Sequence, residues 1–223
     1  MAELVGAWGG WQPRELDLGG GYAAPRDPNT WVYGGDVSQP LAPAIESVVE
    51  TLASALRTGL AGRVPLEGVT LEIEPGRALH ADTGIHLTRV VNLKQQREPL
   101  AWRWVETDTT EMFLLDLLVE HCRFPVVAAT RADEPAQDPV DVVGCSCGFD
   151  VLAHQVRLPA VEAGDTLAFL DTGAYEDACA ANFNALPRPA IVLVSGSDAE
   201  IVRRAETIED VFARDVVPER LLP

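Results

Sequence analysis

The hydrophobic pattern of the chain changes its period near residue 84, and this change restricts the folds that the chain can adopt. Before it, a short strand over 14–18, a polar loop over 23–39, a helix over 41–60 and a buried strand over 69–74 follow one another. The helix is predicted from apolar residues that recur at helical spacing on one face. A strand, a helix and a second strand in this order are typical of α/β units with parallel strands.

After residue 84 the chain consists of short segments that are rich in β-branched residues and separated by turn residues. This pattern favours a mainly antiparallel β domain. The predicted strands cover residues 86–93, 101–106, 124–129, 140–143, 166–170 and 190–194. A long polar loop is predicted over 131–139 and a closing helix over 201–216, and a further short amphipathic helix lies within residues 1–16.

The acidic composition excludes several classes of partner. The 223 residues include 34 acidic and 17 basic side chains, which give a formal net charge of -17. Such a surface repels the phosphates of nucleic acids and anionic lipid headgroups. No apolar run approaches the ~20 residues that span a bilayer, and the first residues lack the features of a signal peptide. We therefore expect no nucleic-acid or membrane partner and a cytoplasmic location.

Two motifs follow the two predicted strands of the α/β part. Gly19, Gly20 and Gly21 come directly after the first strand, where backbone N–H groups without neighbouring side chains can converge on a phosphate. A plain flexible turn explains the same glycines. Glu74-Pro75-Gly76-Arg77 follows the second strand, and at the C-terminal end of a barrel strand such an acid and base can hold a cofactor ring and an anion. A turn with a surface ion pair is the competing interpretation.

Two further motifs lie in the predicted β domain. Gly144-Cys145-Ser146-Cys147 contains two cysteines, but no second pair of cysteines or histidines stands at zinc-ligand spacing, so no metal site is expected. A reactive thiol that donates a proton or acts as a nucleophile is one interpretation, and a pair of buried structural cysteines is the other. Asp171-Thr172-Gly173-Ala174-Tyr175 comes before Asn182-Phe183-Asn184 and Pro187-Arg188-Pro189. A tyrosine like Tyr175 is by itself typical of a core or an interface.

The order of these motifs resembles that of the diaminopimelate, ornithine and arginine decarboxylases, which depend on pyridoxal phosphate (PLP). The resemblance runs from about Leu16 to Leu193. It implies an α/β plus β architecture, in which residues 1–86 form the last strands of an alanine-racemase-like (β/α) barrel. Residues 87–223 would form a mainly antiparallel β-barrel or sandwich domain that ends in the closing helix. The chain would be the C-terminal half of a fold-type III decarboxylase and would lack the lysine-bearing N-terminal half.

The resemblance also implies which residues bind the cofactor. The three glycines would hold the phosphate through backbone N–H groups, and Arg77 and Tyr175 would contact the same group. Glu74 would pair with the protonated pyridine nitrogen, which makes the ring a better electron sink. The implied cofactor-binding residues are Gly19, Gly20, Gly21, Glu74, Gly76, Arg77 and Tyr175.

For catalysis, the resemblance implies that Cys147 protonates the substrate carbon after carbon dioxide leaves, with Cys145 as the second candidate. Asp108 would contact the substrate. The segment Cys147-Gly148-Phe149-Asp150 is one residue shorter than the family pattern and lacks its acidic residue, and the glycines expected beside Asp108 are absent. Diaminopimelate and ornithine are therefore less favoured than a less common amino acid as the substrate.

A lysine that binds the cofactor is missing from the matching motifs. Lys94 is the only lysine in the sequence, and its context predicts an exposed strand lysine. We therefore expect part of a PLP-dependent amino-acid decarboxylase, a carboxy-lyase, that is inactive alone and forms a homodimer or a heterodimer with a lysine-bearing barrel half. The alternatives are a catalytically incompetent homologue that binds and regulates a full-length decarboxylase, and a remnant without function.

Overall fold

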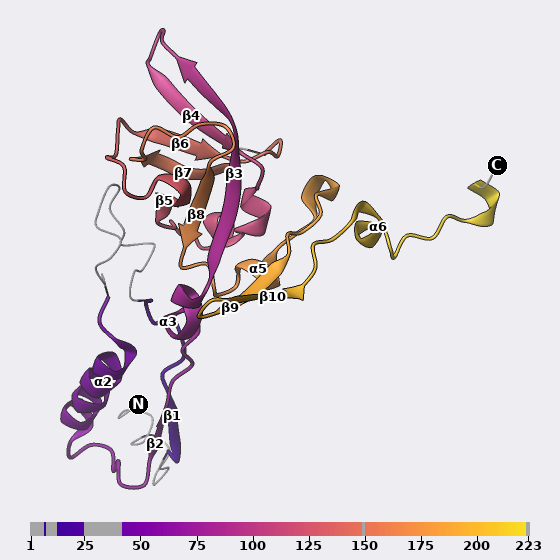
Figure 1. Cartoon of the computed structure of the whole chain (residues 1–223). Helices are drawn as coiled ribbons and strands as arrows, with labels where there is room; N and C mark the ends of the chain where they lie inside the picture. The colour runs from indigo at the N-terminus through magenta and orange to yellow at the C-terminus, as the bar shows by residue number, and fades with distance from the viewer. Residues whose placement is uncertain (1–6, 8–12, 25–41, 149, 222–223) are drawn as a thin grey trace.

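The computed structural model describes residues 7, 13–24, 42–148 and 150–221. Figure 1 shows an N-terminal part at one end, a central β domain, and a two-stranded ribbon followed by a C-terminal segment that extends away from the rest. The predicted helix within residues 1–16 and most of the loop predicted over 23–39 lie outside the described residues. None of the helices in the described ranges is long and apolar enough to cross a membrane.

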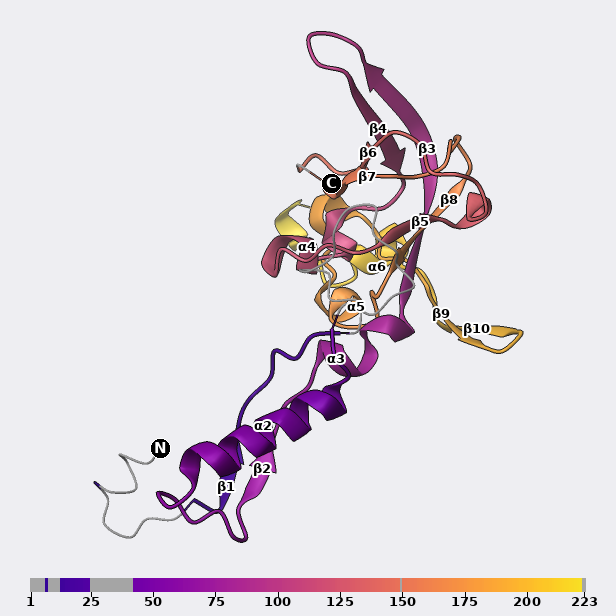
Figure 2. The same cartoon turned by 90° about the vertical axis from the view of Figure 1, so that its left-hand side faces the viewer.

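The N-terminal part has the predicted order of strand, helix and strand. β1 (Glu15–Asp17) pairs in parallel with β2 (Thr70–Glu72), and α2 (Ile45–Leu60) lies between them in the sequence. Figure 2 shows all three at the same end of the molecule. The predicted burial of the second strand is wrong, because the residues of β2 are exposed or half-buried, and β1 is its only neighbouring strand within the described residues. No residue of α2 is buried either.

The central domain is a six-stranded sheet with the order β5-β8-β3-β4-β6-β7. All neighbouring strands are antiparallel except β4 and β6, which are parallel, so the prediction of a mainly antiparallel domain is confirmed. The strand at residues 151–156, which follows the cysteine motif, was not predicted. The strands are β3 (Ile85–Gln96), β4 (Trp102–Thr107), β5 (Val126–Ala128), β6 (Val140–Val143), β7 (Val151–Val156) and β8 (Thr166–Leu170).

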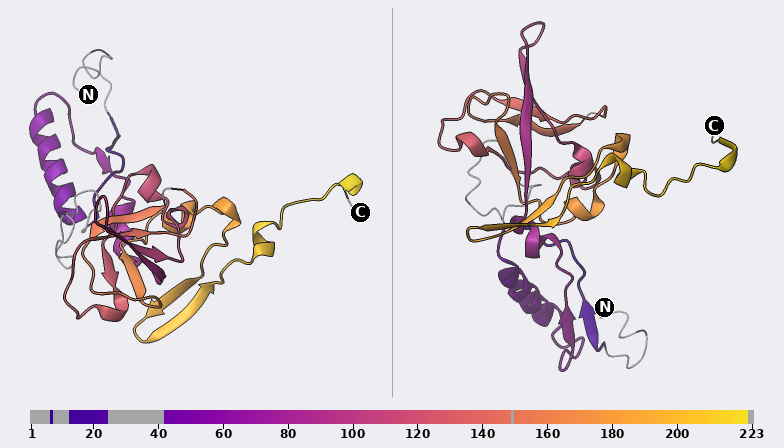
Figure 3. Two further views of the ribbon diagram at one scale, coloured as in Figure 1. Left: turned by 90° about the horizontal axis from the view of Figure 1, so that it is seen from above. Right: turned by 45° about the vertical axis from the view of Figure 1, so that its right-hand side comes forward.

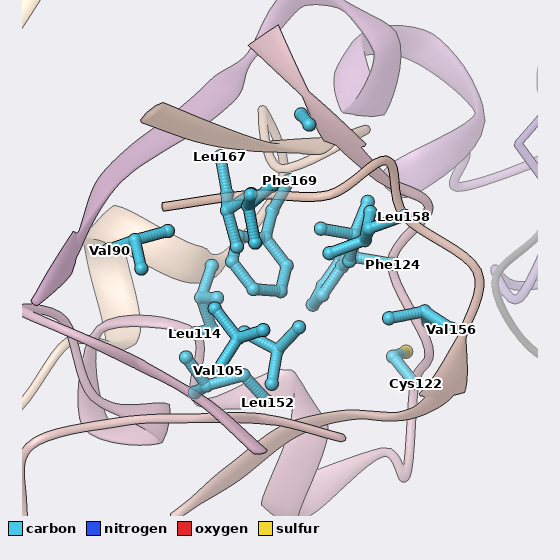
Figure 4. Close-up of a cluster of buried hydrophobic side chains, with 14 residues drawn as sticks. Val90, Val105, Leu114, Cys122, Phe124, Leu152, Val156, Leu158, Leu167 and Phe169 are labelled. Atoms are coloured by element: carbon cyan, nitrogen blue, oxygen red, sulfur yellow. The ribbon is translucent and has the colours of Figure 1, made fainter. Parts of the chain in front are cut away.

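The core of the β domain lies inside the curl of this sheet. Figure 4 shows side chains from β4, β7 and β8 pointing toward a common centre, among them Val105, Leu152, Leu167 and Phe169. Each of these four is at most 1% exposed. Leu167 and Phe169 are two residues apart, as expected for the inward face of a strand. Burial of each such side chain contributes about 1.5–3 kcal/mol, so this cluster fixes the frame on which the site is built.

The C-terminal region differs from its prediction. β9 (Ile191–Ser195) and β10 (Asp198–Arg203) form an antiparallel ribbon, which Figure 3 shows projecting from the β domain. The predicted closing helix over 201–216 is wrong: its first residues belong to β10, and only α6 (Ile208–Val211) is helical. A two-residue turn with Gly196 at a φ of 60° forms the ribbon. A capping box made by Thr207 and Asp210 then starts a helix of one turn.

Short helical turns connect the strands and carry several residues of the candidate site. They are α3 (Arg77–His80), η1 (Ala81–Thr83), η2 (Glu111–Phe113), α4 (Asp116–Val119), η3 (Ala129–Arg131), α5 (Glu176–Cys179), η4 (Phe183–Ala185) and η5 (Glu219–Leu221).

Candidate functional site

The three glycines after β1 lie against the segment that follows β2. The Glu74 N–H donates a hydrogen bond to the Gly19 carbonyl oxygen at 2.8 Å. A Cβ atom on Gly20 would stand 2.7 Å from the Glu74 carbonyl oxygen, so a side chain does not fit at this close approach. Gly19 and Gly21 have φ angles of 70° and 83°, which favour glycine. The structure therefore brings the glycine loop and Glu74 together and gives each glycine a conformational reason.

Tyr175 reaches the predicted Glu-Pro-Gly-Arg motif from far along the chain. Its Oη lies 2.0 Å from the position that a Cβ atom of Gly76 would occupy, and Cζ of Arg77 lies 5.3 Å from the centre of its ring. The backbone holds this approach, because the Gly173 N–H donates to the Ala81 carbonyl oxygen at 2.8 Å. Tyr175 is 46% exposed and has a φ of 69°. Such backbone strain costs about 1–3 kcal/mol and is concentrated at functional sites.

Arg77 lies in a buried charge cluster that sequence reasoning missed. Its guanidinium forms a hydrogen-bonded ion pair with Asp116 at the start of α4, and the two side chains are only 14% and 7% exposed. The Asp116 N–H donates to Oε2 of Glu176 at 3.3 Å. Burial, and then the charge of Asp116, raise the pKa of Glu176 to about 8. In the sequence, only the position of Glu176 directly after Tyr175 could have indicated its place.

Two atoms of this cluster are buried without a hydrogen-bond partner in the described part of the chain. They are Nη1 of Arg77 and Oε1 of Glu176. An unpaired buried donor on a guanidinium costs free energy unless an acceptor satisfies it. The ring of Tyr175 stands over this guanidinium, and the hydroxyl of Tyr175 lies against Gly76. The Arg77 guanidinium and the Tyr175 hydroxyl are donors that suit an anion such as a phosphate, and the carboxyl groups of Asp116 and Glu176 lie in the same cluster.

A buried aspartate, Asp150, holds the loop that carries the two cysteines. Its Oδ1 accepts hydrogen bonds from the Thr110 hydroxyl at 3.0 Å and the Glu111 N–H at 2.7 Å, and its Oδ2 accepts one from the Ser146 N–H. Asp150 is 2% exposed and has a φ of 41°. A Cβ atom on Gly144 would stand 2.3 Å from Asp150 Oδ2, which explains the glycine that opens the motif.

Cys145 and Cys147 are both exposed, so the interpretation of a buried structural pair is wrong. Partial burial of the sulfur, and then the carboxylate of Asp150, raise the pKa of Cys145. The amide Nδ2 of Asn184 lies 3.2 Å from Cys147 Sγ and thereby links the cysteine loop to η4. Among the described residues, no three metal-binding side chains gather in one place.

Asp108 and Lys94 occupy structural positions in the β domain. Oδ1 of Asp108 accepts hydrogen bonds from the Thr88 hydroxyl at 2.7 Å and the Arg89 N–H at 2.8 Å, so it ties the end of β4 to β3. The Lys94 side chain on β3 is 63% exposed and pairs with Glu106 on β4. Lys94 is thus the exposed strand lysine that its sequence context predicts.

Comparison with protein families gives one match that covers most of the chain. The model described as "Pyridoxal-dependent decarboxylase, C-terminal sheet domain" matches residues 30–173. Similar curated proteins include the diaminopimelate decarboxylase of Actinosynnema pretiosum subsp. auranticum, 38% identical over 207 residues, and that of Bacillus subtilis, 32% identical over 169 residues. These alignments cover 91% and 75% of this chain but only 43% and 38% of the relatives.

The fold is also similar to that of solved structures. A crystal structure of diaminopimelate decarboxylase from M. jannaschii superposes with a TM-score of 0.79 at 28% sequence identity. The superposition covers 99% of this chain and 46% of that one. A structure of the same enzyme in complex with L-lysine gives a TM-score of 0.74. The chain therefore spans about half the length of the relatives that it matches.

Proposed function

This chain belongs to the pyridoxal-dependent decarboxylase family, and from that premise we propose that it forms part of a PLP-dependent enzyme that removes the α-carboxylate of an amino acid. One observation carries the proposal. The Glu-Pro-Gly-Arg segment after β2 contacts the glycine loop after β1 through Glu74 and contacts Tyr175 through Gly76 and Arg77, so three distant parts of the chain meet along this segment. The order of these motifs in the sequence does not require them to be in contact, so their contacts in the structure add support to the proposal.

The residues at this place fit PLP. Gly20 and Gly21 are our candidates to offer backbone N–H groups to its phosphate, whereas the Gly19 N–H already donates to Asp17 Oδ1 at 2.8 Å. The unpaired buried Nη1 of Arg77 is our candidate for a charged donor. The Tyr175 hydroxyl, which lies against Gly76, is our candidate for a further contact to the phosphate. Glu74 is our candidate for the partner of the pyridine nitrogen. When bound, PLP supplies the electron sink that accepts the electron pair of the breaking carbon–carbon bond.

We assign Cys147 as the proton donor, with Cys145 as the second candidate. When the α-carboxylate leaves as carbon dioxide, the electron pair of the broken bond ends in a new bond between the α-carbon and the proton that Cys147 Sγ donates, and the sulfur remains as a thiolate. Exposure of the thiol gives the substrate access to it. Asp108 is our candidate for a substrate contact through Oδ2, since Oδ1 already accepts from Thr88 and Arg89.

The lysine that binds the cofactor has to come from outside these 223 residues. Lys94 is the only lysine of the sequence, and it is exposed and paired with Glu106 on the neighbouring strand β4. We propose that residues 1–86 form the last part of a (β/α) barrel and residues 87–223 a β domain. A lysine-bearing barrel half would complete the site, in a homodimer or a heterodimer, and the isolated chain would be inactive.

Reconstitution tests this proposal. The chain is co-expressed with a polypeptide that carries the lysine-bearing half, taken from the Actinosynnema relative or encoded beside this chain. The substrates are diaminopimelate, ornithine, lysine and arginine, each labelled at the α-carboxylate. Diaminopimelate is included because similar proteins are named diaminopimelate decarboxylases. We expect the visible absorbance of bound PLP and release of labelled carbon dioxide, both lost when the partner's lysine is replaced by alanine. A pair that shows neither signal contradicts the proposal.

The second candidate function is a catalytically incompetent homologue that binds a full-length decarboxylase. The single exposed lysine and the altered segment after Cys147 favour it. This function predicts that immobilised chain captures an intact decarboxylase as a stable heterodimer and changes its turnover. Capture without any PLP absorbance in the reconstituted pair would favour this candidate over the first.

A further inference from the structure

Asn184 reaches from η4 to the cysteine loop, which lies far from it in the sequence. Its side-chain Nδ2 is 3.2 Å from Cys147 Sγ and 3.0 Å from the Ser146 hydroxyl oxygen. An amide nitrogen is only a donor, so both contacts place an N–H group on the cysteine loop. The contact is specific to one cysteine of the pair.

The backbone at Asn184 is held in an unusual conformation. Asn184 has φ 57° and ψ 25°, and Ala185 follows with a φ of 58°. Asparagine tolerates the left-handed region better than most residues, whereas alanine does not. Two consecutive residues in this region persist only where the surroundings determine the backbone. The surroundings of the turn therefore fix the backbone that carries the Asn184 side chain.

The residues that flank the turn supply this constraint. Asn182 Nδ2 donates to the Leu186 carbonyl oxygen at 3.0 Å and to Glu206 Oε2 at 2.6 Å. Glu206 also accepts from the Arg188 N–H and Nε, each at 2.9 Å. Hydrogen bonds from Arg188 lower the pKa of Glu206 to about 2, so the Glu206 carboxylate stays charged at neutral pH. The turn is thus fixed by a persistent ion pair.

The cysteine loop is fixed independently from its other side. Asp150 accepts hydrogen bonds from Thr110, Glu111 and Ser146, and the Cys145 N–H donates to the Thr109 carbonyl oxygen at 2.8 Å. Both partners of the contact between Asn184 and Cys147 are therefore held by separate networks. A contact between two independently fixed groups has a defined geometry.

We propose that Asn184 is the positioning residue that selects Cys147 over Cys145 as the proton donor, by donating its amide N–H to Sγ of Cys147. The proposal rests on the assigned role of Cys147 and deepens it. A hydrogen bond to a sulfur is stronger when the sulfur is a thiolate, so Asn184 stabilises the form that remains after proton donation. Cys145 has the opposite surroundings, since burial and Asp150 disfavour its thiolate.

The charged groups around the loop are carboxyl groups, and those of Asp150 and Asp108 disfavour the Cys145 thiolate. Asp150 lies under the loop, and Glu111 Oε1 stands 3.0 Å from the position of a Cβ atom on Gly148. Both carboxyl groups disfavour a nearby thiolate. The neutral donor on Asn184 is thus the favourable contact that the structure gives to Cys147.

Alkylation of the purified chain by iodoacetamide tests the proposal without cofactor or substrate. The rate at each cysteine is followed by peptide mass spectrometry across a range of pH, with the exposed Cys179 as an internal control. Asn184→Gly keeps the left-handed backbone and removes the donor, and Asn184→Asp keeps the shape and replaces the donor by a carboxylate. We expect the Cys147 rate near pH 8 to fall about three-fold in the glycine variant and about ten-fold in the aspartate variant. The Cys147 profile moves to higher pH, while Cys145 and Cys179 stay within about two-fold.

An unchanged Cys147 profile in both variants, or an equal change at Cys145, overturns the proposal. Circular dichroism confirms that each variant is folded. Asn92→Ala, whose amide contacts Glu106 on β4 and not the cysteine loop, is the matched control and should leave the Cys147 profile unchanged. A reconstituted wild-type enzyme without turnover would contradict the proposed function and leave the alkylation result in place. The two failures are therefore distinguishable.

Discussion

Replacement of Glu176 by glutamine removes one titrating group from the buried cluster around Arg77 and keeps its shape. Glu176 is 3% exposed, and burial, followed by the charge of Asp116, raises its pKa from 4.5 to about 8. Between these two pH values the folded chain keeps a proton on Glu176 that the unfolded chain has lost. The free energy of unfolding therefore falls as pH rises through this window. Glutamine carries no such proton, so the variant lacks this dependence.

The size of the effect follows from the two pKa values. Each pH unit within the window changes the free energy of unfolding by about 1.4 kcal/mol for one proton. pH 7 lies some 2.5 units above the ordinary pKa of a glutamate. At this pH, the proton that Glu176 must take up when the wild type folds lowers the free energy of unfolding by on the order of 3 kcal/mol. We therefore expect Glu176→Gln to be more stable than the wild type by on the order of 3 kcal/mol at pH 7 and nearly equal to it near pH 4.5.

Urea unfolding at several pH values, followed by circular dichroism, measures this difference. Other groups also titrate, but they contribute to both proteins, so the difference between the two curves isolates Glu176. The same substitution at the exposed Glu200 on β10 is the control, and it should change the free energy of unfolding by less than about 0.5 kcal/mol. Parallel curves for the wild type and Glu176→Gln between pH 5 and 8 would refute the reasoning.

Three further substitutions test the site. Asp116→Ala leaves the Arg77 guanidinium buried without its partner and should lower the free energy of unfolding by about 3–5 kcal/mol in urea, whereas a loss below about 1 kcal/mol would show that the ion pair is solvated. Asp150→Ala removes an acceptor of three hydrogen bonds and should cost about 2–4 kcal/mol; unchanged stability would contradict its role in the cysteine loop. Gly76→Ala displaces the Tyr175 hydroxyl and should weaken PLP binding by the reconstituted pair about ten-fold in a spectral titration, since one hydrogen bond is lost. Gly59→Ala on α2, where a Cβ atom meets nothing within 4 Å, is the matched control and should leave PLP affinity unchanged.

The sequence predicts those parts of the fold that depend on local pattern. β1, α2 and most strands of the central sheet fall where alternation and β-branched residues place them, because one face of each packs or can pack on apolar neighbours. The contact between the glycine loop and Glu74 was also predictable, since parallel strands end at the same edge. Motif order gives no distances, however, and the approach of Tyr175 to Gly76 depends on the backbone contact between Gly173 and Ala81.

The failures have a common physical cause. Ile201 and Val202 have apolar side chains that suit either a helix or a strand. The turn at Gly196 selects the strand, because it brings β10 alongside β9 and pairs Ile201 with Val192. Asp116 and Glu176 carry no motif, and only tertiary burial gives them a role. Propensity and spacing describe a residue's near neighbours along the chain, whereas pairing and burial depend on residues far from it in sequence.

The N-terminal part gives the strongest structural argument for a partner. Among the residues that the structure describes, α2 is amphipathic but buries none of its side chains, and β1 and β2 form a two-stranded sheet. An isolated two-stranded unit is marginally stable at best in water, and an unfilled apolar helix face loses the burial that stabilises most helices. The curated relatives are about twice as long as this chain, so an additional barrel half has the size to cover both surfaces. We therefore expect α2 and both strands to gain protection from hydrogen exchange when the lysine-bearing half is added, and equal exchange with and without it would argue against a shared barrel.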